Sequence, residues 1–111
     1  VVLPHSSQAQ LVRQLGTSTG KEVSKIEIFN VPVFKSEKYQ FPVPEDSIAY
    51  LECNVYRTLD EGGVGIIFGE VDHAMVDSQA YTDRLLSETE SGKTLHHLGS
   101  KQFVHPGDTI I

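Results

Sequence analysis

Histidines and carboxylates are the side chains of this sequence best suited to chemistry. Two histidines stand in tandem at His96 and His97, while Glu52 and Glu70 fall in two neighbouring stretches of alternating apolar and polar residues. Carboxylates on adjacent strands can divide acid and base work between them. Such residues more often face solvent or pair with a cation across the strands, here Arg57, and that is the role we expect for Glu52 and Glu70.

The histidines do not predict a metal site. Neighbouring side chains of a strand point to opposite faces, so His96 and His97 cannot easily share one ion. His5, His73 and His105 are scattered along the chain. Zinc sites use close, fixed spacings and a clear third ligand, which this pattern does not supply.

An anion site is a second chemical candidate, at Ser6 and Ser7. These residues open a predicted helix. The first turn of a helix carries free backbone amides and the positive end of the helix dipole, which suit a phosphate. The alternative is a plain helix cap, and the sequence favours it.

Composition excludes several classes of function. Nine Lys and Arg stand against fifteen Asp and Glu, for a net charge of -6, with no basic run, so neither nucleic acid nor a polybasic membrane contact is expected. No apolar stretch approaches the roughly 20 residues of a membrane helix. Cys53 is the single cysteine and cannot form an internal disulfide, and no secretory signal opens the sequence. We expect one cytoplasmic domain over residues 1–111.

The elements that must position these residues are mainly strands. Val1-Val2-Leu3-Pro4 is typical of a strand entered part-way, so we expect residues upstream. Residues 6–16 predict a helix, with Ser7 and Gln10 as a capping box and Gly16 as a left-handed terminator. Residues 20–29 suit either a helix or a strand.

A long β-hairpin is the strongest structural signal. Residues 47–59 and 64–76 alternate in polarity around a turn that carries Gly62 and Gly63, and we expect Ile66 and Phe68 in the core. Strands of this length favour a barrel over a flat sheet. The other expected segments are an irregular connection at 30–46, one or two helical turns within 79–87, a solvated loop at 88–93 and a glycine-interrupted strand at 95–104.

The order of several segments resembles the flavin reductase-like family. The resemblance is carried by Val1-Val2-Leu3-Pro4 before the helix, Gly20 to Lys25, Pro44 to Val55 with its Leu51-Glu52-Cys53 strand, Phe68-Gly69-Glu70-Val71, and Leu95-His96-His97-Leu98-Gly99 through Phe103. It implies a mainly β fold with short helices, an FMN-binding split β-barrel whose first strands are absent from this sequence.

The resemblance also implies a cofactor and partners. Members transfer a hydride from NADH or NADPH to a flavin, and the implied cofactor here is FMN, with FAD as the other candidate. Reduced flavin would pass to an acceptor such as a flavin-dependent monooxygenase. Such proteins are usually homodimers with each flavin near the subunit interface.

Site residues follow from the same resemblance. It implies that Ser6, Ser7, Lys25, His97 and Gly99 contact the flavin and that His97 is the catalytic residue. For Lys25 the alternative is a solvated surface cation. For His97 the alternative is a hydrogen-bonded histidine in the dimer interface.

One departure leaves the activity open. Nicotinamide-using members commonly carry glycine-aspartate-histidine at the hairpin turn, where this sequence has Gly62, Gly63 and Val64. The imidazole is absent, which puts ordinary nicotinamide binding at this turn in doubt. Three readings therefore stand: an NAD(P)H-dependent flavin reductase, a non-catalytic split-barrel module that binds a ligand or serves assembly, and the ordered part of a longer reductase.

Overall fold

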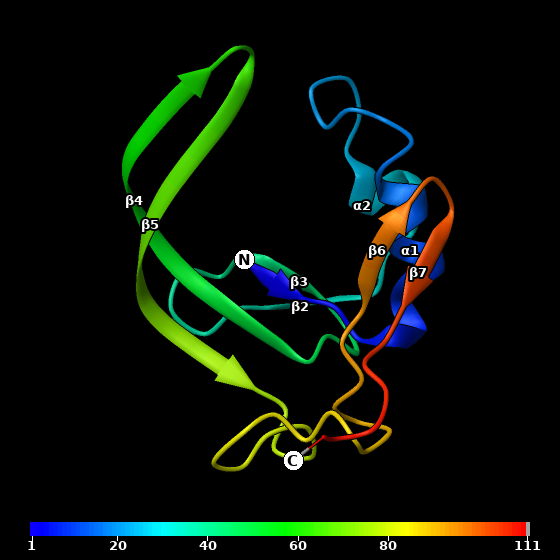
Figure 1. Ribbon diagram of the computed structural model, residues 1–111. Coiled ribbons are helices and arrows are strands. Elements are labelled where there is room, and N and C mark those ends of the chain that lie inside the picture. Colours follow the sequence, from blue (N-terminus) through cyan, green and yellow to red (C-terminus); the bar gives the residue numbers. More distant parts are fainter. Residues whose placement is uncertain (111) are drawn as a thin grey trace.

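The protein is built mainly from strands, as a computed structural model of the chain shows for residues 1–110 (Figure 1). In chain order the elements are β1 (Val2–Leu3), the 3-10 helix η1 (Ser6–Gln8), α1 (Ala9–Leu15), α2 (Lys25–Ile28), β2 (Val33–Lys35), β3 (Pro42–Pro44), β4 (Ala49–Glu61), β5 (Val64–Val76), β6 (His96–Gly99) and β7 (Gln102–Val104). The strands form a sheet of order β1-β4-β5 and two separate hairpins, β2-β3 and β6-β7.

The β4–β5 hairpin confirms the strongest prediction from the sequence. The strands pair antiparallel from Ala49↔Val76 to Glu61↔Val64. Gly62 and Gly63 take φ values of 61° and 83°, and the Gly63 amide donates to the Asp60 side chain at 3.1 Å. Positive φ at both central residues matches the twist of the flanking strands, which is why two glycines close this turn.

The hairpin is bent rather than flat. Register shifts interrupt the pairing at Glu52/Cys53 and at Val55/Arg57. Between them a Cβ built on Gly69 would come within 3.1 Å of the Cβ of Cys53, so the two strands approach closely there. Bulges and a close glycine contact account for the arc that the hairpin makes in Figure 1.

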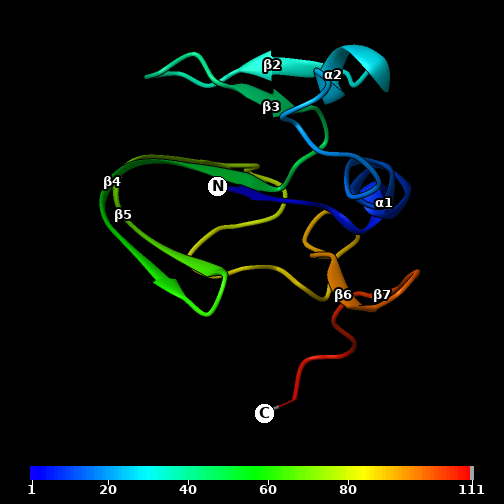
Figure 2. The same cartoon turned by 90° about the horizontal axis from the view of Figure 1, so that it is seen from above.

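The three sheets are arranged in layers around α1. Viewed from above, β2–β3 lies on one side of the three-stranded sheet and β6–β7 on the other, with α1 between them (Figure 2). β1 joins the central sheet through Val2↔Tyr50 and Leu3↔Ala49. The buried apolar side chains of the described residues are Val31, Val43, Ile48, Tyr50 and Ala80.

Two connections differ from the expectation. Residues 30–46 are not irregular throughout, because β2 and β3 pair with Phe34 opposite Val43. Pro42 and Pro44 take alternate positions around Val43, so the side of β3 that lacks donors can face away from β2. Residues 79–87 form turns instead of helix, with a Tyr81↔Leu85 bridge and a hydrogen bond of 2.8 Å from the Leu86 amide to the carbonyl of the buried Ala80.

The structure also decides the predictions for residues 20–29, residues 95–104 and Gly16. Within 20–29 the helix is the correct alternative, as α2 shows. Residues 95–104 form a hairpin rather than one strand, because the chain reverses between β6 and β7. Gly16 ends α1 with φ -78°, so a right-handed cap replaces the expected left-handed one.

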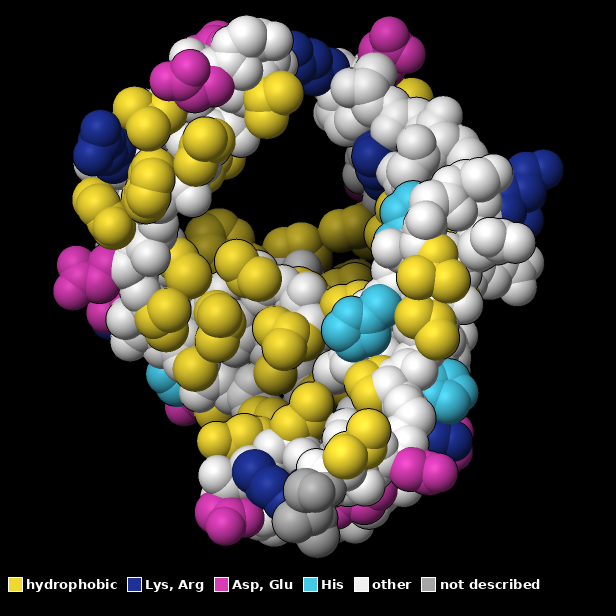
Figure 3. All heavy atoms as spheres, viewed as in Figure 1, with side chains coloured by type: hydrophobic (Ala, Val, Ile, Leu, Met, Phe, Trp, Pro, Cys, Tyr) yellow, Lys and Arg dark blue, Asp and Glu magenta, His cyan; other side chains and the backbone are white. Residues whose placement is uncertain are grey.

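The expected core position of Ile66 and Phe68 is wrong. Ile66 is 42% exposed and Phe68 is half-buried beneath Tyr56 and Arg57. Apolar side chains gather in the open over the outer half of the β4–β5 hairpin (Figure 3). No other described element packs closely enough to bury this half of the hairpin.

Candidate functional site

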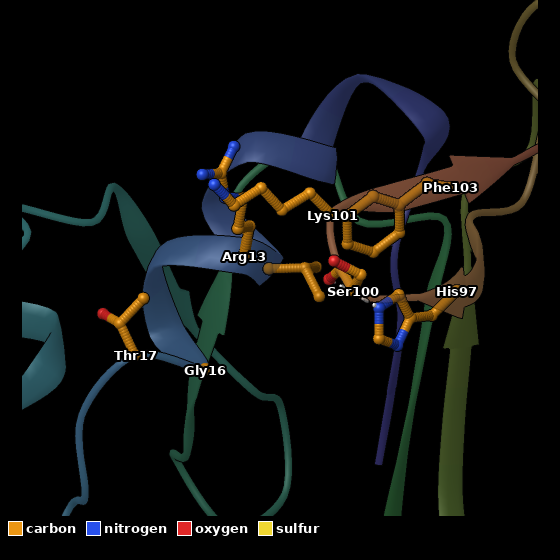
Figure 4. Close-up of a pocket in the computed structure, with 8 residues that line it drawn as sticks. Arg13, Gly16, Thr17, His97, Ser100, Lys101 and Phe103 are labelled. Carbon is orange, nitrogen blue, oxygen red and sulfur yellow. Dashed lines mark hydrogen bonds between the residues drawn. The ribbon is translucent and has the colours of Figure 1, made fainter.

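A pocket of about 520 Å³ lies between α1 and the β6–β7 hairpin. Its lining comes from two stretches far apart in the sequence: Val12, Arg13, Gly16 and Thr17 from the end of α1, and His97, Ser100, Lys101 and Phe103 from the hairpin (Figure 4). A volume of this size falls within the range of small-molecule sites.

His97 forms one wall of the pocket together with Phe103. The ring centroids are 4.9 Å apart and the planes are tilted by 32°. The Nε2 atom of His97 lies 3.2 Å from the Ser100 carbonyl oxygen. Because a carbonyl only accepts, Nε2 carries the hydrogen in this contact, and a neutral ring leaves Nδ1 as an acceptor. The wall therefore offers the faces of two tilted aromatic rings and one polar edge.

Gly99 shapes the turn that holds this wall. Its φ is +115°, and the next residue, Ser100, has φ +52°. A conformation of this kind at Gly99 is strained for any residue with a Cβ. The predicted site residues His97 and Gly99 are thus on one hairpin, although only His97 lines the pocket.

Lys25 lies behind the pocket rather than in its lining. Its Nζ donates to the Leu15 carbonyl at 2.5 Å. Leu15 is the last residue of α1, so Lys25 satisfies a carbonyl that the helix leaves without a partner. The half-buried ammonium is therefore a helix cap in the free protein, and contact with a cofactor stays a prediction.

The amides at Ser6 and Ser7 are already used. The Ser6 amide donates to the Lys93 carbonyl at 2.8 Å, and the Ser7 amide donates to Nδ1 of His5 at 3.1 Å. The capping box starts earlier than expected, since His5 is the N-cap and Gln8 returns a side-chain oxygen to the His5 amide. The imidazole nitrogen takes the acceptor role that a serine oxygen usually plays.

Ser7 faces a different hollow from His97. It lines a pocket of about 260 Å³ together with the carboxylates of Asp46, Asp77 and Glu90. Like charges would repel a phosphate there. The structure therefore does not bring Ser6 and Ser7 to the His97 pocket, and Gly62 and Gly63 also lie outside it, at the tip of the β4–β5 hairpin (Figure 1).

The two carboxylates of adjacent strands are not a pair. Glu70 is exposed and lies opposite Asn54, whereas Glu52 lies opposite His73 and is 2% exposed. The predicted cation also acts elsewhere, because the Arg57 guanidinium lies 5.6 Å from the centre of the Phe68 ring. Of the two, only Glu70 is on the surface.

Glu52 instead holds the segment between β2 and β3. It accepts hydrogen bonds from the Ser36 hydroxyl, from the Tyr39 amide at 2.7 Å and from the Lys38 amide at 3.0 Å. Burial raises the pKa of the Glu52 carboxyl, but these three hydrogen bonds outweigh it and hold the pKa below its ordinary value. No sequence signal pointed to this role, since all the donors come from another hairpin.

The described residues contain neither a group of metal-ligating side chains nor a membrane-spanning helix. Among residues 1–110, no three His, Cys, Asp or Glu side chains are grouped as a metal ion requires. In the same part of the chain no helix is both long and apolar enough to cross a membrane.

Comparison with known proteins adds a family and a fold. The family described as "Flavin reductase like domain" matches residues 1–96. The uncharacterized protein YddH of Escherichia coli (strain K12) is 26% identical over an alignment of 113 positions. The alignment covers 99% of this chain and 60% of that protein.

Solved structures agree with this match. Nitrilotriacetate monooxygenase component B from Bacillus cereus superposes with a TM-score of 0.82 at 19% identity, covering 100% of this chain and 57% of that one. An FMN-binding domain of a flavin reductases-like enzyme from Shewanella baltica OS155 superposes with a TM-score of 0.80 at 19% identity. The match covers 99% of this chain and 60% of that one. The chain thus spans little more than half the length of these relatives. The predicted split-barrel fold, mainly β with short helices, is confirmed.

Proposed function

This chain belongs to the flavin reductase-like domain family, and on that premise we propose that it binds FMN and transfers a hydride from NADH or NADPH to the flavin. The observation that carries the proposal is the pocket between α1 and β6–β7 with its stacked wall of His97 and Phe103. The printed description of the Shewanella baltica relative as an FMN-binding domain supports the choice of cofactor.

The residues of this pocket fit a flavin. An isoalloxazine ring needs a flat apolar surface and a few polar groups at its edge. Phe103 and the ring of His97 supply the surface, and His97 Nδ1 supplies an acceptor. FAD carries the same ring system and would use the same wall.

A bound flavin would supply the redox chemistry, as the acceptor of a hydride from the reduced nicotinamide. The chain contributes position. The hydrogen bond from His97 Nε2 to the Ser100 carbonyl orients the imidazole on its own turn, and the ring of Phe103 packs against it. In the free protein, Ser6, Ser7, Lys25 and Gly99 belong to the caps and the turn that hold α1 and β6–β7, and contact of Lys25 with the flavin is part of the proposal.

The product of such a reaction is reduced flavin, which another protein must consume. The name of the Bacillus cereus relative, component B of a monooxygenase, supports a flavin-dependent monooxygenase as the acceptor. We further propose a homodimer that acts in the cytoplasm.

A specific observation favours a second candidate. The β4–β5 turn carries Gly62, Gly63 and Val64, with no imidazole at the place where nicotinamide-using members carry one. A split-barrel module that holds a ligand or serves assembly without reducing flavin would need no such group.

Anaerobic spectroscopy separates the two candidates. The purified protein is titrated with FMN, and the complex is then mixed with NADH or NADPH while flavin absorbance is followed. If the protein is a reductase, we expect tight binding of FMN and loss of the oxidised flavin band after NADH or NADPH is added. Binding without bleaching by either nucleotide favours the module, and no change in the flavin spectrum or fluorescence contradicts FMN binding altogether.

A further inference from the structure

We propose that the pocket between α1 and β6–β7 is a phosphate site, in which Arg13 and Lys101 hold the phosphate monoester of a nucleotide ligand. The inference rests on the proposed function for the identity of that ligand. It adds two residues that no motif in the sequence marks.

Arg13 and Lys101 reach the pocket from different elements. Arg13 belongs to the last turn of α1, and Lys101 follows the β6–β7 turn. Figure 4 draws both side chains extending toward the same side of the pocket, and both belong to its lining. Two cations that line one pocket make its potential positive, which favours an anion there.

Neither cation has an acidic partner in the part of the chain that the structure describes. The ion pairs of residues 1–110 use Lys38, Arg84, Lys93 and His73, and the pocket lining contains no Asp or Glu. The protein carries fifteen carboxylates and a net charge of -6. Lys21, Lys25, Lys35 and Arg57 form no ion pair among these residues either, so what distinguishes Arg13 and Lys101 is that they line one pocket together without a carboxylate. That arrangement on so acidic a chain favours an anion from outside.

The carbonyl end of α1 does not oppose an anion here. A helix C-terminus is partly negative because its last carbonyls lack partners. Three of the last four carbonyls of α1 are taken: Val12 by the Gly16 amide at 3.1 Å, Gln14 by the Thr17 amide at 3.0 Å, and Leu15 by Lys25. Lys25 thus places a third positive charge at this end of the helix.

The wall of His97 and Phe103 indicates what the phosphate is attached to. Two aromatic rings in the same pocket suit a ligand that itself carries an aromatic ring, so the ligand is a nucleotide rather than a sugar phosphate. Two nucleotides of the proposed reaction carry a phosphate monoester: FMN at its 5′ position and NADPH at its 2′ position. The chemistry of recognition is the same for both.

The test compares ligands that differ only in this phosphate. Dissociation constants of the full chain are measured for FMN against riboflavin by fluorescence quenching, and for NADPH against NADH by calorimetry, in Arg13→Gln and Lys101→Gln. Loss of one charge-assisted contact should raise the dissociation constant of the phosphorylated ligand by about tenfold or more. The dissociation constant of its unphosphorylated counterpart should not change. Both side chains are exposed, so both variants should fold.

Lys21→Gln is the matched control, since it removes an equally exposed lysine outside the pocket. A loss confined to FMN, or confined to NADPH, supports the site and identifies its ligand. The site would be overturned if Arg13→Gln and Lys101→Gln bound FMN and NADPH with the same affinities as Lys21→Gln.

The phosphate site can also be tested if the wild-type chain binds none of the four nucleotides, in which case the proposed function itself fails. Inorganic phosphate is then compared with chloride at matched ionic strength in thermal unfolding. Stabilisation of the wild type that the double variant Arg13→Gln, Lys101→Gln loses supports the site. The same response in both proteins contradicts it.

Discussion

His97 is the residue on which the proposed chemistry depends most directly. It is exposed, and the one hydrogen bond of its side chain in the described chain runs to the carbonyl of Ser100 on its own turn. Its removal should therefore cost the fold little. Its ring stacks on Phe103, so it contributes surface to the pocket as well as a polar edge.

His97→Ala should weaken flavin binding by roughly 2- to 12-fold, the range of one aromatic contact, and slow flavin reduction. The measurements are the dissociation constant of FMN and the bleaching rate with NADH or NADPH. His96→Ala is the control, because that ring bonds to Thr94 and lies outside the pocket. Unaltered affinity and rate in His97→Ala would remove the residue from the site.

Glu52 is the residue on which the second hairpin depends. Glu52→Gln should lower the urea midpoint of unfolding at neutral pH, because an amide nitrogen would face at least one of the three donors from Ser36, Lys38 and Tyr39. Glu70→Gln, an exposed carboxylate of the neighbouring strand, should leave the midpoint unchanged. Equal effects of the two substitutions would contradict the buried role of Glu52.

The same carboxylate predicts a dependence on pH. Its pKa in the folded protein is lower than the ordinary value of 4.5, so its contribution to stability is complete above that value and is lost as the pH falls through the folded pKa. Urea midpoints of the wild type should therefore drop below about pH 4.5, and Glu52→Gln should show a shallower drop. Parallel pH profiles for the two proteins would show that another group carries the acid sensitivity.

At the scale of elements, local signals were the predictable ones. The β4–β5 hairpin follows from alternation and from two adjacent glycines, and β5 begins and ends at the expected residues 64 and 76. The β2–β3 hairpin depends on tertiary contacts instead. Its strands are three residues long, and the segment between them is held by Glu52 of another sheet. A propensity argument cannot detect a partner that is supplied only by the fold.

The site divides in the same way. The resemblance pointed to His97 and Gly99, which share one hairpin, and their roles in flavin binding stay predictions. Arg13 and Lys101 carried no signal, because they lie far apart in the sequence and meet only through the packing of α1 against β6–β7. At Ser6 and Ser7 the sequence left an anion site and a helix cap open and favoured the cap, and the hydrogen bond from the Ser7 amide to His5 agrees with a cap.

The β4–β5 turn supports a prediction about stability. Gly63→Ala should lower the free energy of unfolding by about 1–2 kcal/mol, because its φ of +83° forces the new Cβ into the left-handed region. Gly65→Ala is the control in the same hairpin, where the added Cβ meets open space and φ is ordinary. Chemical denaturation measures both, and equal stabilities would show that the turn relaxes at no cost.

At the scale of the whole molecule, the outer half of the β4–β5 hairpin is apolar on both faces. Val55, Ile67 and Val71 are 60%, 69% and 53% exposed and line an open pocket of about 560 Å³ on one face. Ile66 and Phe68 lie on the other. A two-stranded hairpin is marginally stable without cover, and exposed apolar patches of this kind mark interaction surfaces. The proposed homodimer would cover the first face.

That arrangement gives the last prediction. Ile67→Asp should convert a dimer into a folded monomer, because a carboxylate tolerated at a 69% exposed position becomes costly when a second subunit buries it. Light scattering coupled to size-exclusion chromatography gives the mass, and circular dichroism reports the fold. Ile66→Asp on the opposite face is the matched variant and should remain dimeric. If Ile66→Asp dissociates the dimer and Ile67→Asp does not, the subunits meet through the other face. A wild type that is monomeric at every concentration contradicts the homodimer and leaves the exposed hairpin to a different partner.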